Sequence, residues 1–228
     1  MNLKTYQIYH SPSIPPLDNL WDADAWAKAE TAAVDYFYKE GSVHQPKTEA
    51  KLLWCPEGFA GIYRVEDRYV RSIHTSFQDP VYQDACIEFF VKPAGSTGYF
   101  NFEFNAGGAL LCSYVTDPTR VGTGLKASKR LSLDDCKRVQ IHSSLPDRIE
   151  PELPDPVTWT LQFFIPFSLM ETYTKFTWPN VGDSWRCNFY KCAENNSHPH
   201  WASWQALEGL NFHQPDGFGK LEFVEDAL

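Results

Sequence analysis

Apolar and polar residues alternate along much of the chain after residue 49. The clearest case is YFNFEFN, residues 99–105, in which three phenylalanines alternate with Asn101, Glu103 and Asn105. Because successive side chains of a β-strand point to opposite faces, this pattern predicts a strand with one aromatic face and one polar face.

Further short runs rich in β-branched and aromatic residues are separated by Gly, Pro, Asp and Asn, as strands are. They are EAKLLW (49–54), FAGIYRVE (59–66), RYVRSIHT (68–75), ACIEFFVK (85–92), ALLCSYV (109–115), RVQIHSS (138–144), VTWTLQFFIP (157–166), SWRCNFYK (184–191) and GKLEFV (219–224). Many short strands with little helix between them favour an all-β fold, an antiparallel β-sandwich of immunoglobulin-like or jelly-roll-like type. The chain shows no repeat or change in composition, so we expect one domain over residues 1–228.

Three segments fall outside the strand pattern. DNLWDADAWAKAETAAV (18–34) predicts a short N-terminal helix that carries Trp26 and is capped by Asp22 or Asp24. Residues 116–135 read as a long polar connection, and the proline-rich residues 143–156 as an exposed loop.

Charge and hydropathy exclude some partners. The formal net charge of −9 comes without a basic run, which argues against a nucleic acid. No stretch approaches eighteen apolar residues, so we expect no membrane partner. If Met1 is the natural start, the protein is cytoplasmic, and if a signal peptide was removed it is extracellular or periplasmic. The sequence does not define the oligomeric state.

Six cysteines are scattered along the chain without a CxxC pair: Cys55, Cys86, Cys112, Cys136, Cys187 and Cys192. This distribution predicts reduced, partly buried thiols. Cys187 and Cys192 are an odd number of residues apart on a predicted strand and would face opposite ways, which argues against a zinc knuckle.

The polar face of YFNFEFN is unusual because asparagine is depleted in strands. Two asparagines around Glu103 therefore suggest a function. The segment KPAGSTG fits a hairpin loop that returns the preceding strand beside this one, and in one register Glu88 then lies opposite Glu103. Two opposed carboxylates need compensation from a cation, a basic side chain or the hydroxyl groups of a ligand.

The strand WRCNFYK can add Arg186, Asn188 and Tyr190 to the same face. Carboxylate, amide and guanidinium groups match the neighbouring hydroxyls of a sugar, and aromatic rings match its apolar face. Trp201 and Trp204 lie in a polar stretch, which makes them candidate stacking rings. His198 and His200 flank Pro199 and could shape this loop or hydrogen-bond to a ligand.

Several segments, in this order, resemble carbohydrate-binding module family 9 and the broader family-9-like bacterial domains: LDNLWDADAWAKAE, TEAKLLW, QDACIEFFVKP with YFNFEFN, WTLQFFIPF, WRCNFYKCAENNSHPHWASW and FHQPDGFGKLEF. The resemblance implies a β-sandwich that binds a mono- or oligosaccharide between two aromatic rings, carries structural calcium and is often attached to a xylanase. It places Glu88 at the sugar-contacting glutamate, Tyr82 at a platform that is normally tryptophan, and Trp201 or Trp204 at the second ring.

Three other functions stay open. Glu88 and Glu103 could be the acid and nucleophile of a glycosidase, which in a retaining enzyme lie about 5–5.5 Å apart. Cys192 could be a nucleophile with His198 or His200 as its base. A haem could be held through Met170, although this residue follows IPFSL and reads as a core residue. The resemblance favours a binding protein that supports glycan catabolism.

Overall fold

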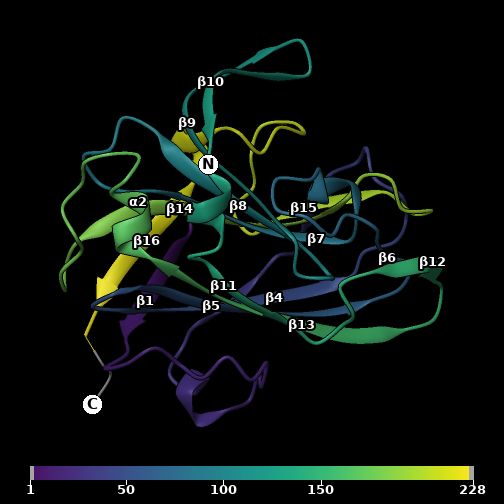
Figure 1. The fold of residues 1–228 in the computed structure, drawn as a ribbon, viewed down its shortest axis with the longest axis horizontal. Coiled ribbons are helices and arrows are strands. Elements are labelled where there is room, and N and C mark those ends of the chain that lie inside the picture. Colours follow the sequence, from purple (N-terminus) through teal and green to yellow (C-terminus); the bar gives the residue numbers. More distant parts are fainter. Residues whose placement is uncertain (1–2, 226–228) are drawn as a thin grey trace.

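Two layers of β-strands, joined at one edge, form the molecule in the computed structural model, which describes residues 3–225 (Figure 1). The first layer contains, in spatial order, β10 (Gly124–Arg130), β9 (Leu110–Val121), β8 (Tyr99–Asn105), β7 (Cys86–Lys92), β14 (Ser184–Ala193) and β16 (Gly219–Val224). The second contains β1 (Thr5–His10), β4 (Lys47–Cys55), β5 (Gly58–Asp67), β13 (Val157–Pro166) and β11 (Gln140–Ser143). The chain is thus an all-β sandwich, as the strand pattern predicts.

Strand β1 joins the two layers because it pairs in parallel with both β16 and β4. The other strand pairs of both layers are antiparallel. Short strands lie beside this framework: β2 (Thr31–Ala33), β3 (Tyr36–Phe37) and β15 (His200–Ser203) in the main sheet, and β6 (Val70–Ser72) with β12 (Ile149–Leu153) in a separate pair. The helical elements are one-turn pieces: η1 (Asp24–Trp26), η2 (Val81–Gln83), η3 (Pro215–Gly217), α1 (Leu133–Cys136) and α2 (Phe167–Met170).

Aromatic side chains fill the space between the layers. Phe104 of β8 stacks on Phe163 of β13 with ring centroids 4.9 Å apart, and Phe59 of β5 meets Phe89 of β7 at 5.7 Å. Burying one such side chain contributes about 1.5–3 kcal/mol. The aromatic half of the alternating pattern therefore faces the core, and the polar half of β7 and β8 faces outward.

The N-terminal segment differs from the predicted helix. Its helical part is only the 3₁₀ turn η1, and its end, Thr31–Ala33, is the strand β2. The N-cap of η1 is Ala23 without a side-chain hydrogen bond, so neither Asp22 nor Asp24 caps it. Trp21 and Trp26 are both buried in one cluster. They are five residues apart, a spacing that a longer helix would not place on one face.

The two predicted loops also contain strands. Residues 116–135 are largely the β9–β10 hairpin, which extends from the body of the molecule at the top of Figure 1, and residues 143–156 include β12. None of the predicted loop residues in β9 and β10 is fully buried, so the strong hydrophobic alternation that marks a half-buried strand is weak here.

The burial of the cysteines and of Met170 agrees with the prediction from the sequence. All six cysteines are buried free thiols, and Met170 is buried in the main core. Met1 lies outside the described residues. Within residues 3–225, no helix is long and apolar enough to cross a membrane.

Candidate functional site

The outward face of β7, β8 and β14 carries the polar residues that the alternation predicts. Glu88 pairs directly with Glu103 across β7 and β8, and with Tyr190 across β7 and β14. The hairpin therefore adopts the register that sets the two carboxyl groups face to face.

A cavity of about 450 Å³ opens over this face. We call it the polar cavity. Its lining residues are Tyr82, Glu88, Asn101, Glu103, Leu111, Ser113, Arg120, Thr123, Gly124, Leu125, Ser128, Arg130, Cys192, Glu194, Trp201, Leu210, Asn211, Phe212 and His213. They come from β7, β8, β14 and the β9–β10 hairpin, and from segments around η2, β15 and η3. Of the predicted site residues, the structure brings together five: Tyr82, Glu88, Asn101, Glu103 and Trp201.

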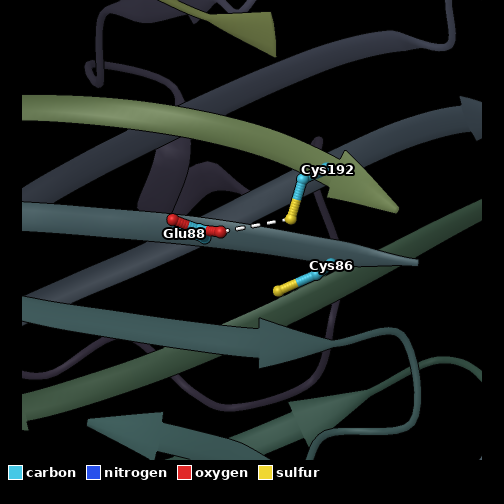
Figure 2. A group of neighbouring side chains, drawn as sticks. All are labelled: Cys86, Glu88 and Cys192. Carbon is cyan, nitrogen blue, oxygen red and sulfur yellow. Dashed lines mark hydrogen bonds between the residues drawn. The ribbon is translucent and has the colours of Figure 1, made fainter. Parts of the chain in front are cut away.

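Both carboxyl groups at the floor of the polar cavity are buried, with Glu88 3% and Glu103 5% exposed. Asn101 Nδ2 donates to Glu103 Oε1 at 2.6 Å, and Asn101 Oδ1 accepts from the Ser113 amide at 2.9 Å. Cys192 Sγ donates to Glu88 Oε1 at 3.2 Å (Figure 2). These contacts fix the orientation of both carboxyl groups before any ligand arrives.

Burial raises the pKa of both carboxyl groups. For Glu88, the neighbouring Cys192 and Glu103 add to this effect and raise the pKa well above its ordinary value. For Glu103, burial also dominates, and the hydrogen bond from Asn101 and the charges of Arg130 and Arg120 offset part of it. A carboxyl that keeps its proton can donate a hydrogen bond as well as accept one, which suits a hydroxylated ligand.

Arg120 and Arg130 were not identified from the sequence. Both are exposed at the rim of the polar cavity and belong to the β9–β10 hairpin, where the sequence predicts a loop. The sequence does contain a signal for this hairpin, which is Gly122 at its turn. In the structure β9 ends at Val121 and β10 begins at Gly124, and Gly122 between them has φ 58. A two-residue connection that starts with glycine is typical of a tight hairpin turn.

Aromatic and heterocyclic rings form the walls. Tyr82 and Trp201 are partly buried and line the cavity, and Trp201 Nε1 donates to Glu194 Oε1 at 3.4 Å. His213 Nδ1 is 2.6 Å from the Tyr99 hydroxyl. Burial, with a contribution from Arg120, lowers the pKa of His213 to about 3, so its ring is neutral at ordinary pH.

Three of the predicted site residues use their polar groups within the protein. Asn105 Nδ2 donates to Asp84 Oδ2 and to the His74 carbonyl, at 2.9 and 2.7 Å. Asn188 Nδ2 donates to the Gln205 carbonyl at 2.9 Å, and the Tyr190 hydroxyl donates to the Phe212 carbonyl at 3.0 Å. These residues do not line the polar cavity, and they hold the loops around it.

Arg186, His200 and Trp204 lie elsewhere. Arg186 donates to the Phe218 carbonyl at 2.9 Å and lines a different cavity of about 520 Å³. His200 is buried beside Lys191, with 2.8 Å between His200 Nε2 and Lys191 Nζ. Trp204 is 5% exposed and packs in the main core, so it is not available as the stacking ring that the sequence suggests.

The described residues do not gather a calcium ligand set. Calcium takes six to eight oxygen ligands. Within residues 3–225, the one group of three or more His, Cys, Asp or Glu side chains with closely spaced ligand atoms is Cys86, Glu88 and Cys192, and two of those atoms are sulfur. Asp84 Oδ1 is a buried oxygen without a protein partner, but a single oxygen is not a site. The acidic side chains of residues 3–225 therefore do not by themselves supply the oxygen ligands of the calcium that the family resemblance implies.

Solved structures with the same fold include proteins linked to carbohydrate binding. A candidate carbohydrate-binding protein from Bacteroides uniformis ATCC 8492 is 26% identical over 97% of this chain and 100% of its own, with a TM-score of 0.80. A family 9 carbohydrate-binding module from Caldicellulosiruptor kristjanssonii, solved with cellotriose, is 16% identical over 98% and 95% of the two chains, with a TM-score of 0.65. A family 9 module from the same organism, solved with glucose, is 15% identical over 97% of each chain, with a TM-score of 0.60.

None of the curated proteins matches this chain. The model of the family described as "Carbohydrate-binding family 9" matches residues 18–223, which include the strands of both layers except β1 and the last residue of β16, and all the residues that line the polar cavity. The chain therefore belongs to carbohydrate-binding family 9.

Proposed function

We propose that the polar cavity binds a mono- or oligosaccharide. The observation that carries this proposal is the combination, in one cavity, of oriented carboxyl and amide groups with two partly exposed rings. Glu88, Asn101 and Glu103 supply hydrogen-bonding groups at the floor, and Tyr82 and Trp201 supply apolar ring faces at the wall. Sugar sites need both, because a pyranose has hydroxyls around its edge and C–H groups on its faces.

Size and family membership support the proposal. A volume of about 450 Å³ lies within the range of small-molecule sites, about 300–1,000 Å³. Two structures with this fold were solved with cellotriose and with glucose. We infer that a glucose-type sugar is a suitable first probe and that its capture serves glycan catabolism.

Calorimetric titration with glucose and with cellotriose tests the proposal. We expect the wild type to bind at least one of them, and Trp201→Ala to weaken binding by about tenfold, equivalent to about 1.4 kcal/mol. Glu103→Gln keeps the shape of the floor but replaces a carboxyl group by an amide, which changes the hydrogen-bond donors and acceptors, and we expect a similar loss of affinity. Trp178→Ala, which removes a 38% exposed ring outside the polar cavity, is the matched control. Failure of both sugars to bind, or unchanged binding by both cavity variants, would contradict the proposal.

The facing carboxyl groups of Glu88 and Glu103 also favour a second candidate, a glycosidase. Two carboxyl groups on opposed strands can approach the separation of a retaining pair, about 5–5.5 Å. Release of reducing sugar from a panel of glycans by the wild type, and its loss in Glu103→Gln, would replace the binding function with catalysis. Binding without release supports the carbohydrate-binding function.

A further inference from the structure

Three potential metal ligands converge between β7 and β14. The Sγ atoms of Cys86 and Cys192 and a carboxylate oxygen of Glu88 all lie within 4.8 Å of one another. Figure 2 shows the sulfur of Cys192 and the carboxyl group of Glu88 joined by a hydrogen bond, with the sulfur of Cys86 beside them.

Strand register produces this cluster. Cys86 and Cys192 are directly paired across β7 and β14. Glu88 follows two residues after Cys86, so its side chain emerges on the same face of β7. The positions are therefore set by two neighbouring strands and not by a flexible loop, which keeps the ligands in place before an ion arrives.

The spacing suits a tetrahedral ion. Zinc binds sulfur at about 2.3 Å and carboxylate oxygen at about 2.0–2.2 Å, so ligand atoms around it lie roughly 3.5–3.8 Å apart. The 3.2 Å between Cys192 Sγ and Glu88 Oε1 and the 4.8 Å limit on the other pairs bracket that range.

The electrostatics of the cluster also favour a cation. Within residues 3–225, neither Glu88 nor Glu103 is in an ion pair, although both are buried. A buried carboxylate without an opposite charge beside it is costly, and a bound divalent ion removes that cost. Lys191 neighbours Cys192 in sequence but pairs with Asp67 of the second layer, so it does not occupy this position.

An ion can reach the cluster from solvent. Glu88 and Cys192 line the polar cavity, which is open at its rim, while Cys86 does not line it. Three protein ligands leave a fourth tetrahedral position, and because Glu88 and Cys192 both line the polar cavity we place that position on the cavity side. This is the arrangement of an accessible zinc site, where water or a ligand takes the open position.

We propose that Cys86, Cys192 and Glu88 form a binding site for a divalent ion of the zinc class. Thiolate ligands select zinc-class ions over calcium and magnesium, which prefer oxygen. Each thiol gives up its proton to solvent as its sulfur binds the ion. The site stands independently of carbohydrate binding, although Glu88 takes part in both.

Cobalt(II) is the probe that tests this site. The full-length protein is washed with chelator, kept reduced with a phosphine, and titrated with Co²⁺ while its absorption spectrum is recorded. We expect a near-ultraviolet thiolate-to-cobalt band that saturates at one ion per chain and disappears when Zn²⁺ is added. Cys86→Ala and Cys192→Ala should each weaken binding by about tenfold or more, and Glu88→Gln should shift the visible bands.

Cys187→Ala is the matched control, because Cys187 is a buried thiol on the same strand that faces the core between the layers. It should bind Co²⁺ like the wild type. If circular dichroism shows that Cys86→Ala does not fold, the visible absorption spectrum of Co²⁺-loaded Glu88→Gln is the measurement that tests the proposal. Absence of a thiolate band in the wild type, or the same band in a Cys86→Ala/Cys192→Ala double variant, would overturn the proposal. Sugar titrations of metal-free Cys86→Ala, whose altered residue does not line the polar cavity, test carbohydrate binding separately.

Discussion

Lys191 is a single buried residue that stabilises the floor of the polar cavity from the side of the second layer. Its side chain is fully buried, with Nζ 3.5 Å from Asp67 Oδ2 and 2.8 Å from His200 Nε2. Asp67 also lies 2.8 Å from His44 Nε2. Burial alone would raise the pKa of Asp67, but Lys191 and the histidines outweigh it and hold this pKa well below its usual range. The carboxylate is therefore ionised and paired with the ammonium of Lys191.

Removing one member of this pair should cost more than removing both. Lys191→Met leaves a buried carboxylate without its cation, and we expect a loss of about 3–5 kcal/mol in the free energy of unfolding. Adding Asp67→Asn to the same chain should recover part of that loss, because no unpaired charge remains. Urea unfolding of the two single variants and the double variant gives the coupling energy. Strictly additive losses would mean that the two side chains contribute independently.

At the scale of single residues, the sequence predicts well which face of a strand a side chain lies on, but poorly which distant residues that side chain contacts. Alternation alone aligns Glu88, Asn101 and Glu103, because the period of a strand is local. The roles of Asn105 and Trp204 depend on segments far away in the chain. Asn105 is held by Asp84, and Trp204 packs edge-on against Tyr6, with ring centroids 6.3 Å apart.

At the scale of elements, the β9–β10 hairpin is the largest difference between prediction and structure. Its outer half is largely exposed, with Leu125 only partly buried, so the alternation of apolar and polar residues is weak and Gly122 at the turn is the clearer sequence signal. The hairpin brings Arg120 and Arg130 to the rim of the polar cavity. Their charges offset part of the effect of burial on the pKa of Glu103.

We expect the hairpin to contribute to ligand affinity and hardly to stability. The double variant Arg120→Gln/Arg130→Gln should weaken sugar binding by about tenfold, because it removes charged hydrogen-bond donors worth about 1.5–3 kcal/mol each at best. Its unfolding free energy should change by less than about 0.5 kcal/mol, since both residues are exposed. Arg148→Gln, an exposed arginine outside the polar cavity, is the control in the same calorimetric titration. Unchanged affinity in the double variant would remove the hairpin from the proposed site.

At the scale of the whole molecule, buried titratable groups make stability depend on pH in two opposing ways. Burial, with a contribution from Lys191, lowers the pKa of His200 to about 3, and burial with Arg120 lowers that of His213 to about 3. An unfolded histidine titrates near 6.5. Between these values the unfolded chain binds more protons, so each histidine reduces stability as the pH falls. Glu88 and Glu103 act in the opposite direction, because burial raises their pKa values and the folded state binds protons that the unfolded state releases.

Because these contributions offset each other in the wild type, single variants reveal them. The quantity to measure is the free energy of unfolding at pH 7.5 minus that at pH 5, from urea titrations. One histidine with its pKa lowered to about 3 contributes about 2 kcal/mol to this difference, since it stays neutral at pH 5 while its unfolded form is mostly charged. We therefore expect the difference to fall by about 2 kcal/mol in His213→Gln and to rise in Glu103→Gln, where a stabilising protonation at low pH is lost. If this difference changed in the same direction in both variants, the buried histidine and the buried carboxyl groups around the polar cavity would not have opposite effects on the pH dependence of stability.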